Sequence, residues 1–283
     1  SNNKKRSRNI TIGAVIGFLL SCTAVAGVED KYLWIKKDGE IKFNTTATID
    51  ADGSWSEENP YEEIIWNADT QTYTNNMTLL SSKANGKDGS YDISYGLRLS
   101  EDMTGLNFIN NGSVIGIVND TGFGYGIYNS AKIGDITNRG IISGTGYGYG
   151  SGFGIYNIGT MGNIINTGII SGTGGGIGIH NLGPIGDITN RGIITGSDSD
   201  YGSGYGIYNN KSNTDSEIKN ITNAGVISGT GYGSGYGIVN YEVIDIITNR
   251  GVISGTGSSS GYGVENYEVI DIITNRGVIS GTG

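Results

Sequence analysis

A nine-residue pattern of alternating residue types recurs along most of the chain. It reads apolar-x-Asn-x-Gly-x-apolar-x-Gly, as in Ile136 to Gly144, and its seven copies start 24 to 33 residues apart. The copies begin at Phe108, Ile136, Ile164, Ile188, Ile221, Ile247 and Ile273. Because every second residue of a strand faces the same way, the pattern predicts strands with Ile, Asn and Gly on one face. Repetition at this spacing is typical of a solenoid.

A second phrase, Tyr125 to Asn129, alternates with the first. Together they divide one repeat into three short strands, which we expect at residues 125–129, 133–138 and 141–144. Three strands joined by turns have the size of one coil of a parallel β-helix. We therefore predict an all-β fold, a parallel β-helix of about seven coils with an N-terminal β cap.

Stacked coils place like residues above like, at about 4.8 Å per coil. An inward Asn must be paired, so we expect a structural ladder in which each amide bonds to backbone and to the Asn above and below. The ladder consists of Asn138, Asn166, Asn190, Asn223, Asn249 and Asn275. We expect the aromatic column of Tyr125, Phe153, Tyr205, Tyr236 and Tyr262 to be mostly buried.

One apolar column has two interpretations. Strict alternation points the residue after the central Gly outward, whereas a turn at that Gly would tuck it inside. If these apolar residues point outward, they form a candidate partner-binding surface together with neighbouring tyrosines. Its residues are Ile141, Ile169, Ile193, Val226, Val252 and Val278, with Tyr128, Tyr156 and Tyr208.

Residues 1–26 are typical of a secretory signal peptide. Basic residues at 4–8 precede the apolar run Ile10 to Leu20, and Ala24-Val25-Ala26 offers a cleavage site. Export is therefore expected, and cleavage would remove Cys22, which is the only cysteine. Residues 19–22 also resemble a bacterial lipobox, so an acylated Cys22 is the alternative.

Residues 27–111 differ from the repeats, contain all three Trp residues, and are expected to cap the open end of the solenoid. Leu33 to Ile35 and Ile41 to Phe43 flank Asp38-Gly39 and predict a hairpin. Residues 50–54 lack the spacing of a calcium loop, so no metal is assigned. Residues 112–283 are the repeats, and because they stop within a repeat at Gly283, we expect the chain to be a fragment.

Composition and motifs argue against several kinds of chemistry. The net charge of −9 with no basic patch after residue 8 disfavours nucleic acid. His180, the only histidine, occupies a tyrosine position of the repeat, and we interpret it as a surface ladder residue. No cofactor motif is present. Asp135 and Asp187 recur with Arg139 and Arg191, and such groups across coils would be needed by a polysaccharide lyase or hydrolase. We interpret them as solvated ladders and expect no enzyme activity.

With its signal peptide, cap and Ile-x-Asn-x-Gly-x-Ile-x-Gly coils, the chain resembles the passenger region of bacterial type V autotransporters. Filamentous-haemagglutinin-like surface proteins share this style of repeat. The resemblance implies a right-handed β-helix exported to the cell surface and used in adhesion or virulence. It also implies attachment to the outer membrane through a β-barrel that is absent from this chain. The partner would be an unknown host or bacterial surface ligand, protein or glycan. The alternative is a secreted carbohydrate-active β-helix enzyme.

Overall fold

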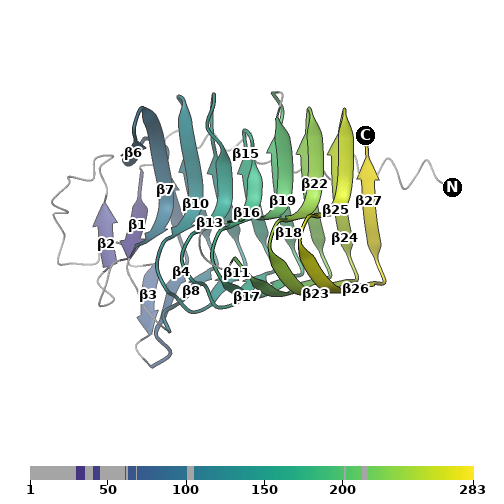
Figure 1. Cartoon of the computed structure of the whole chain (residues 1–283). Helices are drawn as coiled ribbons and strands as arrows, with labels where there is room; N and C mark the ends of the chain where they lie inside the picture. The colour runs from purple at the N-terminus through teal and green to yellow at the C-terminus, as the bar shows by residue number, and fades with distance from the viewer. Residues whose placement is uncertain are drawn as a thin grey trace.

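The computed structural model describes residues 30–35, 41–44, 61, 63–67, 69–100, 105–200, 202–211 and 216–283. This part of the chain is all-β, and its parallel sheets stack into a β-solenoid of about six turns (Figure 1). The predicted fold class is confirmed, with a number of turns close to the expected seven. Each turn runs through one strand of three sheets, which we call sheets 1, 2 and 3.

Sheet 1 holds the Tyr125 phrase and its equivalents. Its strands are, in spatial order, β2 (Ile41–Asn44), β1 (Tyr32–Ile35), β7 (Tyr91–Leu99), β10 (Gly122–Asn129), β13 (Gly152–Asn157), β16 (Ile177–Asn181), β19 (Ser203–Asn209), β22 (Ser234–Asn240) and β25 (Ser260–Asn266), with β6 (Gly86–Asp88) also paired to β7.

Sheet 2 holds the first half of the nine-residue pattern, up to its Asn. Its strands are β3 (Ile64–Asn67), β4 (Thr72–Asn75), β8 (Asn107–Asn110), β11 (Ile136–Asn138), β14 (Ile164–Asn166), β17 (Ile185–Asn190), β20 (Ile218–Asn223), β23 (Val243–Asn249) and β26 (Val269–Asn275).

Sheet 3 holds the second half of the pattern. Its strands are β5 (Thr78–Ser81), β9 (Ser113–Ile117), β12 (Ile141–Thr145), β15 (Ile169–Thr173), β18 (Ile193–Asp198), β21 (Val226–Gly231), β24 (Val252–Gly257) and β27 (Val278–Thr282).

Antiparallel strands gather at the N-terminal end of the solenoid. The expected hairpin is confirmed, since β1 pairs with β2 in antiparallel register, and β3 pairs with β4 in the same way. Strands β2 and β3 thereby cover the first parallel strands of sheets 1 and 2. The parallel stack itself starts at β1, β4 and β5, within the region expected to form the cap. Residues 1–29 and 50–54, with the expected signal peptide and Asp-Gly loop, lie outside the described residues.

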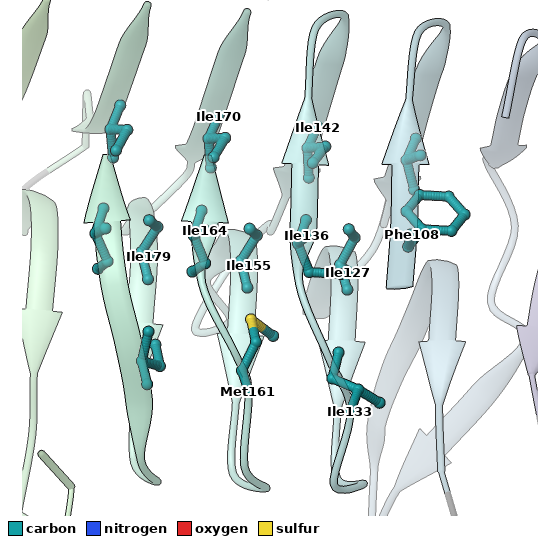
Figure 2. Packing of buried hydrophobic residues seen from close by; sticks show 14 of the residues in the cluster. Phe108, Ile127, Ile133, Ile136, Ile142, Ile155, Met161, Ile164, Ile170 and Ile179 are labelled. Atoms are coloured by element: carbon teal, nitrogen blue, oxygen red, sulfur yellow. The ribbon is translucent and has the colours of Figure 1, made fainter. Parts of the chain in front are cut away.

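Columns of isoleucine fill the interior of the solenoid. Ile136 stacks on Ile164 in sheet 2, Ile142 on Ile170 in sheet 3, and all four are fully buried (Figure 2). Phe108 belongs to the sheet 2 column as predicted, but the column begins one turn earlier, at the buried Tyr73 of β4. Each turn therefore buries its apolar residues against its two neighbours, which is how a chain of 36% apolar residues forms a continuous core.

Two ladders of buried asparagines run along the corners of the solenoid. In the predicted ladder, the Asn138 amide donates to Asn166 Oδ1 (2.8 Å) and to the carbonyls of Gly140 and Ile169. Each Asn of this ladder bonds to the next in the same way, from Asn75 through to Asn275. A second ladder, which we did not predict, ends the strands of sheet 1 at Asn129, Asn157, Asn181, Asn209, Asn240 and Asn266.

Sheets 1 and 3 touch backbone to backbone near the turns that join them. A Cβ added to Gly144 would lie 2.1 Å from the Phe153 carbonyl oxygen. A Cβ added to Gly124 would lie 2.1 Å from the Thr145 carbonyl oxygen. No side chain fits between the sheets at this height, so glycine is required there. This seam is one structural reason for the glycine repeated in every coil.

We expect Asn166→Ala to lower the free energy of unfolding by about 2–3 kcal/mol, because it leaves buried polar partners unsatisfied. The midpoint of urea unfolding measures the change. The matched control is Asn111→Ala, an exposed amide that bonds to Asn76 and should cost less than about 0.5 kcal/mol. Equal midpoints for the two variants would show that the ladder does not hold the coils together.

We expect Gly144→Ala to lower the melting temperature markedly, since the added methyl group forces the two sheets apart and overpacking costs about 1–3 kcal/mol. Thr145→Ala, the next residue and on the outer face of the same strand, serves as control. A Gly144→Ala variant as stable as this control would contradict the close contact of sheets 1 and 3.

Candidate binding surfaces

The predicted apolar column lies on the outer face of sheet 3. Ile141, Ile169, Ile193, Val226, Val252 and Val278 stack in register, and the first five are half-buried while Val278 is exposed. Alternation therefore holds through the turn, because the next residue, such as Ile142, is the one that enters the core. Hydroxyl ladders flank the column, with Ser171 donating to Ser143 (3.1 Å) and Thr173 to Thr145 (3.0 Å).

The predicted tyrosines lie on the outer face of sheet 1. Tyr128, Tyr156, His180 and Tyr208 stack in register, and the rings of Tyr128 and Tyr156 are 5.6 Å apart. The two parts of the predicted partner surface are thus not brought together. Sheets 1 and 3 face each other through the glycine seam, so their outer faces point in opposite directions.

The aromatic column expected to be mostly buried is buried at Tyr125 and Phe153, but it lies on this outer face. Gly126 and Ile127 both point inward, since a Cβ on Gly126 would meet Ile142 and Ile127 is fully buried, so Tyr125 is turned out. Tyr125 stacks on Tyr95 and Phe153 at 5.4 and 5.0 Å and contacts Tyr128 edge-on. These rings are buried against one another, apart from the core. Towards the C-terminal end the column becomes exposed at Tyr262.

His180 is buried within these rings, which corrects its interpretation as a surface residue. It lies 5.0 Å from both Tyr156 and Tyr208 and is 9% exposed. Neither ring nitrogen has a hydrogen-bond partner among the described residues. Burial lowers the pKa of His180 to about 3, so the ring is neutral near pH 7. Burial also raises the pKa of Tyr95 to about 12.

The carboxylates considered for an enzyme are engaged in holding one coil to the next. Asp135 Oδ1 accepts from the Asn163 backbone N–H (2.7 Å), and Asn163 Oδ1 accepts from the Asp187 N–H (2.8 Å). Asp187 Oδ1 in turn accepts from the Asn220 amide (2.7 Å). These residues form a structural ladder on sheet 2 rather than a convergent acid–base pair. In the described residues, no group of three or more His, Cys, Asp or Glu side chains is placed to hold a metal ion.

The turns joining sheet 3 to sheet 1 form one edge of the solenoid, which we call the ridge (Figure 1). The described residues of these turns are 118–121, 146–151, 174–176, 199–200, 202, 232–233 and 258–259. Three of its tyrosines are strongly exposed: Tyr147 (60%), Tyr149 (90%) and Tyr232 (57%). Sequence reasoning missed them. The signal was present, however, because each follows a glycine in a segment whose length varies between repeats.

Comparisons with known proteins give no relative for this chain. No protein-family model matches it, and searches of curated proteins and of solved structures also found no match. Among the described residues, no helix has the length and apolar character needed to cross a membrane.

The buried His180 predicts a pH-dependent stability. In the unfolded chain His180 binds a proton below about pH 6.5, but in the folded chain only near pH 3, so stability falls as the pH drops between these values. The variant His180→Tyr, which matches Tyr156 and Tyr208, lacks this loss. Relative to the variant, the free energy of unfolding of the wild type should fall by about 2 kcal/mol between pH 7 and pH 5, as measured by urea unfolding.

No other histidine contributes, because His180 is the only one in the chain. A difference between wild type and variant that stays constant from pH 7 to pH 5 would contradict the burial of this ring.

Proposed function

We propose that the chain is part of an exported cell-surface stalk that binds a partner and acts in adhesion, as the resemblance to autotransporter passenger regions implies. In this proposal residues 1–26 direct export and the solenoid is a rigid rod. The partner is bound along the rod by repeated contacts, so that weak individual contacts add to a tight attachment.

The observation that carries the proposal is the exposed aromatic ridge. Tyr149 is almost fully solvated on a Gly-flanked turn, and Tyr147 and Tyr232 lie on the same edge. Tyrosine combined with Gly and Ser is the composition of protein surfaces evolved to bind diverse ligands, because its ring offers contact area at a low entropic cost. A binding surface requires exposed side chains on loops that a rigid scaffold supports. Here the tyrosines lie on turns whose length varies between repeats, and the strands below them stay in constant register.

A binding role also accounts better than catalysis for the polar groups of the solenoid. Asp135 and Asp187 accept hydrogen bonds across coils, and His180 is buried with a lowered pKa. A hydrolase or lyase needs groups that converge on a substrate with suitable protonation states. We therefore propose a protein that binds without turning over its ligand.

The proposal predicts that beads coated with the chain adhere to host-cell or bacterial surfaces, and that removing the ridge tyrosines abolishes adhesion. We expect the triple variant Tyr147→Ser, Tyr149→Ser and Tyr232→Ser to reduce the number of attached beads at least tenfold. The matched control is Tyr267→Ser, which removes a tyrosine of similar exposure (54%) from the turn between sheets 1 and 2.

Wild-type beads that attach no better than albumin-coated beads would contradict adhesion. Release of soluble sugar from a polysaccharide by the wild-type chain would instead support the enzymatic alternative.

A further inference from the structure

The ridge has a step at one turn of the solenoid. In sheet 3, Thr145, Thr173 and Ser197 are in register, and in sheet 1, Phe153, Ile177 and Tyr205 are in register. In each coil we count the residues between the sheet 3 position and the sheet 1 position. The counts are seven (146–152), three (174–176) and seven (198–204). The middle turn is thus four residues shorter than either neighbour. Two residues are missing from the ascending side and two from the descending side, so the tip of this turn lies roughly 6–7 Å below the tips of its neighbours. Figure 1 shows this lower turn between β15 and β16.

Glycine backbone forms the floor of the step. Gly174 and Gly175 have φ values of 72° and 64°, a conformation that other residues rarely adopt. Both stay partly accessible, although the floor is fixed by hydrogen bonds from Gly146 N–H to Thr173 O (3.0 Å) and from Gly176 N–H to Ser197 O (3.1 Å). A rigid floor without side chains allows a ligand to approach the peptide groups closely.

The two walls are each tied to the coil beyond them. On one side, Tyr147 exchanges two backbone hydrogen bonds with Gly122 of the preceding coil, and its turn carries the exposed Tyr149. On the other side, Asp198 O accepts from the Tyr232 N–H of the following coil (3.1 Å). These bonds hold the backbone of each wall to the coil on its far side. The walls are two coil spacings apart, about 10 Å.

The chemistry of the walls differs from side to side. One wall carries the exposed tyrosines Tyr147 and Tyr149. The other offers Asp198 and the exposed Asp200, which are ordered by bonds from Asp200 N–H to Asp198 Oδ1 (2.8 Å) and from Ser199 Oγ to Asp200 Oδ1 (3.0 Å). Each carboxylate keeps further acceptor capacity. Residues 145–153, 173–177 and 197–209 contain no Lys or Arg.

We propose that the step binds a sugar unit of a neutral glycan, an inference that rests on the adhesive function proposed above and names its ligand class. Sugar rings present C–H groups that pack on the negative face of a tyrosine ring. Their hydroxyl groups donate to carboxylates in charge-assisted hydrogen bonds, and peptide groups on the floor complete the contacts. The carboxylates repel acidic glycans, and no basic residue in these segments compensates for them.

The test measures binding of the whole chain to immobilised hexasaccharides by biolayer interferometry. The probes are four neutral hexamers, built from mannose, glucose, galactose or N-acetylglucosamine, and one acidic hexamer of galacturonate. We expect at least one neutral hexamer to bind, and the galacturonate hexamer to bind at least tenfold more weakly. Tyr149→Ala should weaken neutral binding at least tenfold, whereas the control Tyr267→Ala, in the turn between sheets 1 and 2 and outside the ridge, should change it less than twofold.

A second variant tests the step itself. Insertion of Tyr-Gly-Tyr-Gly between Gly174 and Gly175 restores a seven-residue turn and should abolish neutral binding while leaving Tyr149 in place. If the insertion prevents folding, the Tyr149→Ala variant still tests the inference, because Tyr149 is exposed and its replacement should leave the fold intact. The inference is overturned if the folded chain binds no neutral hexamer, or if Tyr149→Ala binds as well as wild type.

The bead assay separates this inference from the proposed function. If beads adhere to cells through the ridge but the chain binds no neutral hexamer, the adhesive function is supported and only the glycan inference is rejected. Loss of adhesion after protease treatment of the cells would then identify a protein as the partner.

Discussion

The structure depends on the requirement that each asparagine amide of the two ladders find its partners in the neighbouring coil. Asn138, for example, bonds to Asn166 Oδ1 and to the Ile169 carbonyl, both of which belong to the next turn. A slip of one residue would leave these buried groups unsatisfied and would turn the isoleucines out of the core. The ladders therefore fix the register of all three sheets, and the isoleucine columns then supply the apolar burial.

This constraint divides the chain into fixed and variable parts. The strand residues and the glycine seam are bound to their neighbours above and below, whereas the ridge turns contribute little to the interior. The short turn at residues 174–176 and the longer turns beside it occur over strands in unbroken register. Length and composition can change at the ridge without disturbing the core, so the candidate ligand contacts lie where substitution is least restricted.

The sequence was sufficient for the fold because its pattern reports directly on strand alternation. The Ile136 and Asn138 columns and the outward Ile141 column all follow from a period of two. The pattern did not show that the buried Tyr125 lies on the outer face, because two successive residues, Gly126 and Ile127, face inward and reverse the alternation. Period alone cannot reveal such a reversal. The opposite placement of the Ile141 and Tyr128 columns, and the burial of His180, depend on how the sheets meet in space and have no local signature.

The direction of the asparagine ladders has a mechanical consequence. The described strands run from the β1–β4 end of the rod to β27, and the amide bonds run along the line joining these ends (Figure 1). If the chain acts as the proposed stalk, tension between an anchored end and a held partner loads the bonds between coils in series. Because each coil touches only its neighbours, failure peels one coil from the end while the remainder keeps its structure. The proposed stalk would then lengthen under load by releasing chain in units of 24 to 33 residues.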